Sequence, residues 1–267
     1  MSVIQRTVAI LALAAASFAP CPLYAQGMDI AKAAIVDLTH AIDHNTIFWP
    51  TETKTFELVE EHKGLTDRGF FYAANRFCLP EHGGTHIDAP YHFAKGGLPV
   101  GALPLDRMVG PAAVIDIAAK AASNVDYTLS VDDVAAWESR HGKIEPGTIV
   151  LLRTGWSNRW PDKLTYLGSD KPGDASDLHF PSYGVAAVRL LIGRGVTVIG
   201  VDTASIDNGP SKDFLVHRAA GASGVIGLEN LANLDKLPAK GAWIVALPMK
   251  IAHGTGAPAR VIAFVSH

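Results

Sequence analysis

Three histidines and an aspartate lie within eleven residues of one another, at His82, His86, Asp88 and His92. Imidazole nitrogens and carboxylate oxygens are protein groups that bind zinc and manganese. Four such groups in one short segment indicate a divalent-metal site, and Zn²⁺ or Mn²⁺ is the expected cofactor. Two simpler interpretations stay open: the histidines form hydrogen bonds within a loop, or they build a closed structural metal site.

The residues between these side chains favour a turn that runs into a short strand. Two glycines and the nearby Pro90 disfavour a helix that would carry His82 and His86 on one face. On a strand, His86 and Asp88 point to the same side, and the glycines allow His82 to fold back and join them. Three ligands from one compact hairpin leave coordination positions for water and substrate. A zincin protease is excluded, because Gly83 stands where that motif needs a glutamate.

His92 follows Asp88 by four residues, after Pro90 has turned the chain. An imidazole with an unperturbed pKa of about 6.5 suits general acid/base catalysis near neutral pH. The alternatives for His92 are a structural role behind the ligands or a role as a further ligand. Asp202 and Asp207 follow an apolar run and are expected either to orient ligand histidines or to cap a turn.

Short apolar runs bounded by Gly, Pro or Asp predict the strands that position this site. The consecutive apolar residues of 149–152 are typical of a strand covered on both faces. Helices are predicted over Val131–Arg140, between Ser130 and Gly142, and over Tyr183–Arg194. This pattern predicts an α/β fold, a single domain with a mixed sheet. The predicted strands are Ala34–Leu38, Phe70–Leu79, Ala112–Ile117, Thr148–Arg153, Val196–Val201, Trp243–Leu247 and Arg260–Val265.

The composition is that of a folded domain with a small-molecule partner. The chain has 267 residues, 48% hydrophobic and 18% charged, which excludes a wholly disordered chain. A net charge of −3 without runs of like charge lacks the basic surface of a nucleic-acid binder. Neither nucleic acid nor a membrane is expected as a partner. The polar segment Trp156–Phe180 is expected to be a pocket wall or lid, or else a plain surface loop.

Residues 1–25 are interpreted as a secretory signal peptide, because Arg6 precedes the apolar stretch Val8–Ala19. That stretch is too short to cross a hydrocarbon core of about 30 Å. Residues 26–267 would then form the mature domain, in the periplasm or secreted. Cys78 is the only cysteine of the mature chain, which excludes an internal disulfide. Its apolar neighbours predict a buried core thiol, with a reactive nucleophile as the alternative.

The stretch from His82 to His92 matches the pattern His-x-Gly-Thr-His-x-Asp-x-Pro-x-His at every position. In this the chain resembles the cyclase family of metal-dependent hydrolases. Further segments that resemble the family are Phe48-Trp49-Pro50, residues 200–207 and residues 247–250. The resemblance implies a swivelling β/β/α domain. Family members include bacterial kynurenine formamidase and isatin hydrolase, which open an amide bond next to an aromatic ring.

The resemblance also implies roles for the matched residues. His82, His86 and Asp88 would be metal ligands, and His92 would be the general acid/base.

In the dinuclear formamidases, a histidine and a glutamate twelve residues later hold a second zinc. His217 and Glu229 have this spacing. Isatin hydrolase is known as a single-manganese enzyme, and the segment Trp156–Phe180 looks more like that subgroup. One or two ions per chain are therefore expected.

The implied substrate is a small amide, either an N-formyl arylamine such as N-formylkynurenine or a cyclic aryl amide such as isatin. Phe48, Trp49 and Phe71 are predicted to bind it, although isolated aromatic residues are also typical of a core. Because relatives are commonly dimers or larger, a homo-oligomer is expected. The alternative from another class is a non-catalytic periplasmic metal-binding or sensing protein, which would not need His92 as a proton shuttle.

Overall fold

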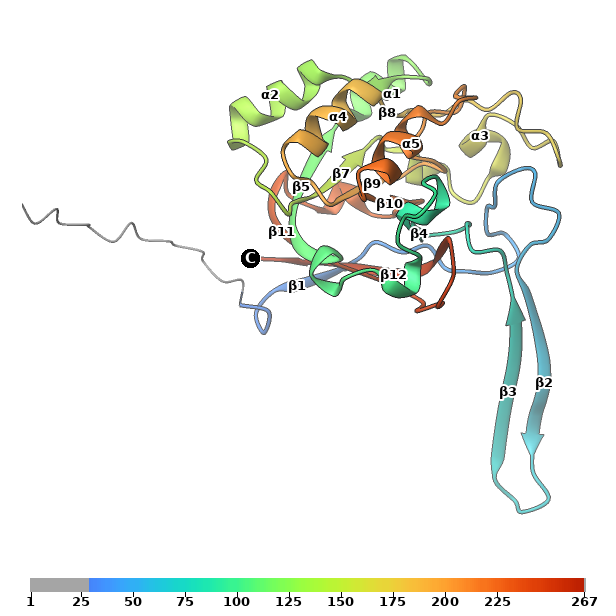
Figure 1. Cartoon of the computed structure of the whole chain (residues 1–267). Helices are drawn as coiled ribbons and strands as arrows, with labels where there is room; N and C mark the ends of the chain where they lie inside the picture. Colours follow the sequence, from blue (N-terminus) through green and yellow to red (C-terminus); the bar gives the residue numbers. More distant parts are fainter. Residues whose placement is uncertain (1–28, 267) are drawn as a thin grey trace, which may run out of the picture.

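A computed structural model of the chain describes residues 29–266 (Figure 1). The predicted signal peptide, residues 1–25, lies outside the described residues. Within residues 29–266, no helix has the length and hydropathy that a membrane span requires.

One mixed sheet of eight strands forms the centre of the molecule, in the order β1-β12-β11-β5-β7-β9-β10-β4. Strand β12 also pairs with β4, so the sheet closes on itself. The neighbours β5, β7, β9 and β10 are parallel, whereas β4, β11, β12 and β1 join by antiparallel pairs. The strands are β1 (Ala34–Asp37), β4 (His86–Asp88), β5 (Val109–Asp116), β7 (Ile149–Arg153), β9 (Val198–Val201), β10 (Ile226–Glu229), β11 (Lys240–Pro248) and β12 (Gly256–Val265).

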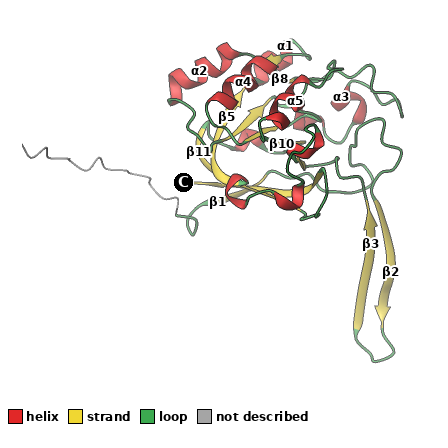
Figure 2. Ribbon diagram, viewed as in Figure 1, coloured by secondary structure: helices red, strands yellow, loops and turns green. Residues whose placement is uncertain are grey.

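The helices cover one face of the sheet (Figure 2). The predicted helix Val131–Arg140 is confirmed, because Ser130 and Asp133 form a reciprocal capping box and Gly142 ends the helix at φ 83°. The α-helices are α1 (Ala118–Ser123), α2 (Val131–His141), α3 (Lys163–Leu167), α4 (Val185–Gly193) and α5 (Leu215–Ala222). The 3₁₀ turns are η1 (Pro90–His92), η2 (Val100–Ala102), η3 (Leu105–Arg107), η4 (Trp156–Arg159) and η5 (Leu234–Lys236).

The second predicted helix begins later than its sequence pattern suggests. Ser182 and Tyr183 form strand β8 (Ser182–Tyr183), which pairs in parallel with β6 (Thr128–Leu129), so helix α4 starts at Val185. Tyr183 instead directs its hydroxyl to the carbonyl oxygens of Val150 and Gly200, at 3.0 and 2.8 Å.

Strand β7 shows why the sheet holds together. Ile149 and Leu151 pack in the cluster inside the closed sheet, while Val150 and Leu152 pack against the helices. All four side chains are fully buried, as the run of apolar residues predicts. Each contributes about 1.5–3 kcal/mol of burial free energy, which fixes the frame that carries the site.

Two segments extend this frame. Strands β2 (Glu57–Leu65) and β3 (Phe71–Cys78) form an antiparallel ribbon that projects away from the body, here called the arm (Figure 1). Cys78 ends the arm and is exposed, so the prediction of a buried core thiol is wrong. The segment Trp156–Phe180 packs inward: Trp156, Tyr166 and Phe180 are buried in a cluster that also includes Ile47.

Candidate metal centre and active site

Strand β4 is the base of the site, and its two neighbours in the sheet leave room for its polar side chains. In the pairing with β10, His86 lies opposite Glu229 and Asp88 lies opposite Gly227. A Cβ atom on Gly227 would lie 3.4 Å from Asp88 Oδ2, so the glycine leaves space for the carboxylate. The sheet therefore brings together His86 and Glu229, which are far apart in the sequence.

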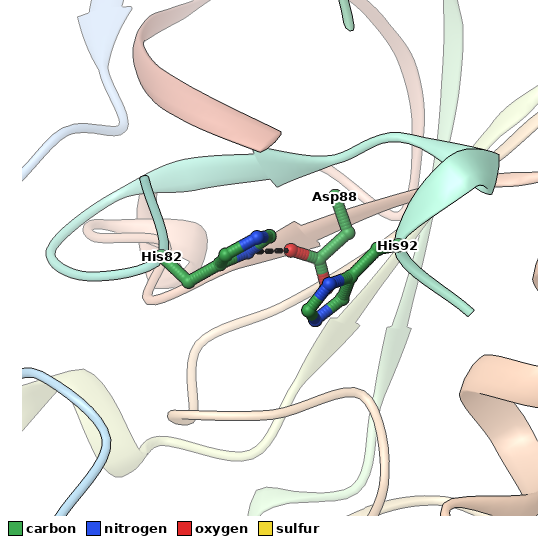
Figure 3. A group of neighbouring side chains, drawn as sticks. All are labelled: His82, Asp88 and His92. Carbon is green, nitrogen blue, oxygen red and sulfur yellow. Dashed lines mark hydrogen bonds and ion pairs between the residues drawn. The ribbon is translucent and has the colours of Figure 1, made fainter. Parts of the chain in front are cut away.

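The turn before β4 folds His82 back over the strand. Its Nδ1 lies 2.7 Å from Asp88 Oδ1 (Figure 3). A Cβ atom on Gly83 would lie 2.0 Å from Cδ1 of Phe48, so only glycine admits the Phe48 ring against this turn. The second glycine, Gly84, has φ 57°, a left-handed conformation that favours glycine.

Asp88 is the common neighbour of three imidazoles. Its Oδ1 faces His82 and lies 3.2 Å from His86 Nε2, while its Oδ2 lies 3.0 Å from His217 Nε2. Glu229 faces the same two histidines, at 3.4 Å from His86 Nε2 and 3.2 Å from His217 Nε2. All five predicted ligands thus converge, and the Asp88 carboxylate stands between two groups of donors.

In His86 and His217, the ring nitrogen that points away from the cluster forms a hydrogen bond, which shows which nitrogen faces the cluster. His86 Nδ1 lies 2.9 Å from the carbonyl oxygen of Gly84, and His217 Nδ1 lies 2.7 Å from Asp207 Oδ2. Both partners only accept, so each Nδ1 carries a proton, and each Nε2 is the nitrogen that a metal ion in the cluster would take. His86 Nε2 is buried without a hydrogen-bond partner among the described residues, which fits a metal ligand.

Charge in the cluster is balanced between buried acids and buried imidazoles. Burial would raise the pKa of Asp88, but the facing imidazoles, that of His82 foremost, hold this pKa well below its usual value. Burial would lower the pKa of His86, but Asp88 and Glu229 raise it to about 9. The pKa of Glu229 is raised by burial and by the neighbouring Asp88. Without a metal, protons therefore supply the positive charge that the carboxylates require.

His92 lies in η1, and its imidazole lies close to Asp88 and His82 (Figure 3). Its ring stacks on that of His82, with centroids 3.9 Å apart and planes inclined by 20°. One potential ligand atom from each of His82, Asp88 and His92 lies within 4.8 Å of the others. Burial lowers the pKa of His92 to about 4, so its imidazole is neutral at pH 7 and can accept a proton.

A pocket of about 220 Å³ opens onto the cluster. This is smaller than the roughly 300–1,000 Å³ of sites for drug-sized ligands, so the pocket suits a small molecule. Phe48 and Trp49 line it, as does Phe214, whose ring lies 5.4 Å from that of Phe93. Phe214 has φ 48° and ψ 47°, a left-handed conformation that is unusual for a bulky residue and is typical of constrained functional segments.

Within one chain, the structure does not bring the predicted Phe71 to this pocket. Phe71 begins strand β3 on the arm, is 64% exposed and does not belong to the pocket wall of its own chain. The sequence pattern predicted a strand here but did not show that this strand belongs to a ribbon that projects from the rest of the molecule.

Sequence reasoning did not single out Phe214, Phe93 or Asn230 as contributors to the site. Phe93 and Asn230 line the pocket, and Asn230 Nδ2 donates to the carbonyl oxygen of Gly84 at 2.9 Å. The hydroxyl of Tyr166 donates to Asn230 Oδ1 at 2.9 Å, so the segment Trp156–Phe180 helps to support the site. The position of Asn230 directly after Glu229 was the signal available in the sequence.

The two aspartates predicted either to orient ligand histidines or to cap a turn differ in role. Asp207 accepts from the backbone N–H of His217 at 3.0 Å as well as from its ring, so it holds this histidine in place. Asp202 instead accepts from the backbone N–H groups of Thr154 and Gly155, at 2.8 and 2.9 Å, and anchors the start of the Trp156–Phe180 segment.

Known proteins share this architecture over nearly the whole described chain. The family model described as "Putative cyclase" matches residues 36–208. An isatin hydrolase from Roseibium aggregatum is 37% identical over 249 residues, covering 88% of this chain and 92% of that protein. A kynurenine formamidase from Salinibacter ruber is 28% identical over 229 residues, covering 86% and 96%. The crystal structure of an isatin hydrolase bound to the product analogue thioisatinate has a TM-score of 0.80 and 32% identity, covering 89% and 94%.

These matches and the donor set around Asp88 define the class of protein, a metal-dependent hydrolase. The chain belongs to the cyclase family. The expected fold of that family is confirmed by the mixed sheet and by the structural match.

Proposed function

We propose that this protein hydrolyses the C–N bond of a small aryl amide, either an N-formyl arylamine such as N-formylkynurenine or a cyclic aryl amide such as isatin. The observation that carries the proposal is that the His/Asp/Glu cluster lines a small pocket whose wall also includes Phe48, Trp49 and Phe214. The similar isatin hydrolase and kynurenine formamidase, named for substrates of these two kinds, support it.

The cofactor we propose is Zn²⁺ or Mn²⁺, held by His82, His86 and Asp88. His217 and Glu229 would complete the coordination of this ion or hold a second one, since His217 Nε2 lies 3.0 Å from Asp88 Oδ2 and 3.2 Å from Glu229 Oε1. Imidazole and carboxylate donors suit either metal. A divalent ion here would polarise the amide carbonyl and make water more acidic.

The residues of the chain account for the remaining requirements of amide hydrolysis. The aromatic side chains of the pocket would pack on the ring of the substrate and leave its carbonyl beside the His/Asp/Glu cluster, which lines the same pocket. His92 is neutral at pH 7, so it can take a proton from the attacking water and deliver it to the leaving nitrogen. The stacking of His92 on His82 keeps its imidazole at the edge of the ligand cluster.

A hydrolysis screen tests the substrate class. Metal-reconstituted protein would be assayed with N-formylkynurenine, isatin, a simple lactone and an aliphatic dipeptide. We expect turnover of at least one aryl amide and none of the dipeptide. Tight metal binding without turnover of any of these compounds would instead favour a non-catalytic metal-binding protein.

We also propose that the protein is a homo-oligomer, assembled through the arm. An isolated two-stranded ribbon is marginally stable in water. Phe70, Phe71, Tyr72 and Phe77 are 50–64% exposed. At about 150–250 Å² per aromatic side chain, these four residues leave roughly 400 Å² of aromatic surface exposed on each chain, which a partner could cover. Two reciprocal arms would supply about 800 Å², half of a standard interface of about 1,600 Å².

Light scattering tests this assembly. The wild-type protein should have at least twice the mass of one chain, and the Phe71→Ser/Phe77→Ser variant should shift toward the monomer. A monomeric wild type at micromolar concentration would contradict the proposal.

For localisation we propose the periplasm or the exterior of the cell, after removal of residues 1–25. The composition of this segment supports the proposal. N-terminal sequencing of protein from fractionated cells tests it. A mature chain that begins at Gln26 in the periplasmic or external fraction is expected, and an uncleaved cytoplasmic chain would contradict it.

A further inference from the structure

His82 differs from the other ligand histidines in what stands behind it. Its Nδ1 faces Asp88, and its Nε2 lies 2.8 Å from the hydroxyl oxygen of Thr255. The same hydroxyl lies 2.6 Å from Glu81 Oε2, which also accepts from the backbone N–H of Thr255 at 2.9 Å. A chain of hydrogen bonds therefore connects the Glu81 carboxylate, through the Thr255 hydroxyl, to the His82 imidazole. Glu81 and Thr255 are 174 positions apart in the sequence.

The direction of this hydrogen-bond chain follows from the donors and acceptors available. The Glu81 carboxylate only accepts, so the Thr255 hydroxyl gives its single proton to Oε2. The hydroxyl oxygen can then only accept from His82 Nε2, which must carry the ring proton. His82 Nδ1, which faces Asp88 at 2.7 Å, is then the nitrogen that a metal ion would take.

The backbone around Thr255 is shaped to allow this contact. A Cβ atom on Gly256 would lie 2.5 Å from Cε1 of His82, and one on Gly254 would lie 2.6 Å from Glu81 Oε1. The carbonyl oxygen of Thr255 also accepts from the backbone N–H of Ala89 at 2.9 Å. The turn Gly254–Gly256 is thereby fixed to the end of the strand that carries the other ligands.

We propose that Glu81 and Thr255 are positioning residues, which set the tautomer and orientation of His82 for metal binding. This inference rests on the proposed metal-dependent function. It gives His82 the same kind of support that the Gly84 carbonyl gives His86 and that Asp207 gives His217. Partners of this kind typically change metal affinity by about 10–100-fold when they are removed.

Variants of Thr255 and Glu81 test the inference by metal affinity, measured in competition with a chelator using Mn²⁺ or Zn²⁺ alone. Thr255→Val removes the acceptor and should weaken binding by about 10–100-fold. Thr255→Ser retains the hydroxyl and should stay within a few-fold of wild type. Glu81→Gln replaces the carboxylate by a weaker acceptor and should give a smaller loss than Thr255→Val. Thr66→Val, on the arm, is the matched control and should leave affinity unchanged.

Nitrogen-15 NMR of the imidazoles provides a readout that a purely structural role would not move. In the Zn²⁺-loaded protein, the Nε2 proton of His82 should be protected from exchange with water in wild type and in Thr255→Ser, and should exchange faster in Thr255→Val, which lacks the hydroxyl acceptor.

Wild-type affinity in folded Thr255→Val would overturn the inference. If Thr255→Val does not fold, wild-type affinity together with unchanged exchange of the His82 Nε2 proton in Glu81→Gln would overturn it equally. A wild-type protein that binds neither ion would instead show that the metal-dependent function itself is wrong, and the inference would fail with it.

Discussion

Metal binding to this site should release protons and should therefore strengthen as the pH rises. In the metal-free protein, Asp88 and Glu229 raise the pKa of His86 to about 9 against the opposing effect of burial. The pKa of His217 is also raised well above its usual value by Asp207, Asp88 and Glu229, again against burial. A metal ion must displace these protons, because only a deprotonated imidazole can be a ligand.

The magnitude follows from the pKa of His86. At pH 7, removing a proton from a group with a pKa of about 9 costs about 3 kcal/mol, since one pKa unit corresponds to about 1.4 kcal/mol. Apparent affinity should thus rise about tenfold per pH unit below pH 9 for this proton alone, and more steeply if His217 releases one too. Calorimetry in buffers of different ionisation enthalpy should detect one to two protons released per chain at pH 7.

The same pKa predicts the stability of the metal-free protein. A histidine whose pKa is raised in the folded state stabilises that state fully below its unfolded pKa of about 6.5, and this contribution is lost as the pH rises through about 9. For the buried His86 this loss is about 3 kcal/mol. The metal-loaded protein should lack this decline.

His86→Gln should release about one proton fewer, whereas His44→Gln, at an exposed histidine, is the control and should behave as wild type. Metal affinity that stays constant between pH 6 and 8, with no proton release, would refute this description of the cluster.

The other predictions concern single residues. His92→Ala should retain metal in elemental analysis yet lose about 10²–10⁴-fold in kcat, and an unchanged kcat would rule out proton transfer by His92. Glu229→Gln should lower the stoichiometry or the affinity in a metal titration, and unchanged stoichiometry, affinity and activity would exclude Glu229 as a ligand. Asp133→Ala should lower the free energy of unfolding in urea by about 1–2 kcal/mol, because Asp133 accepts from the backbone N–H of Ser130 at 2.9 Å; Asp132→Ala, at an exposed site, should cost less.

Local sequence patterns predicted those parts of the structure that local physics determines. The run of apolar residues at 149–152 predicts the buried strand, and the Ser130/Asp133 capping box predicts the start of helix α2. The cluster of His82, His86 and Asp88 comes from one short segment whose glycines and strand alternation fix its geometry. The fold class and the centre of the site were therefore accessible from the sequence.

The remainder depends on contacts that no local pattern encodes. Strand β2, residues Glu57–Leu65, has no continuous apolar face, so the sequence pattern predicts neither this strand nor its pairing with β3. Helix α5 is short and includes Gly221, where a Cβ atom would lie 3.1 Å from the carbonyl oxygen of Pro90. That glycine makes the helix hard to predict and also allows it to pack against η1. The contact between Thr255 and His82 likewise exists only once the sheet has closed.

Activity as a function of bound metal tests the central claim most directly. The protein would be stripped with a chelator, titrated with Mn²⁺ or Zn²⁺ and assayed with its best aryl amide substrate. Activity should disappear on stripping and return in proportion to metal until one or two ions are bound per chain, and His86→Ala should not recover. Full turnover by the stripped wild-type protein, with metal absent by elemental analysis, would contradict the account.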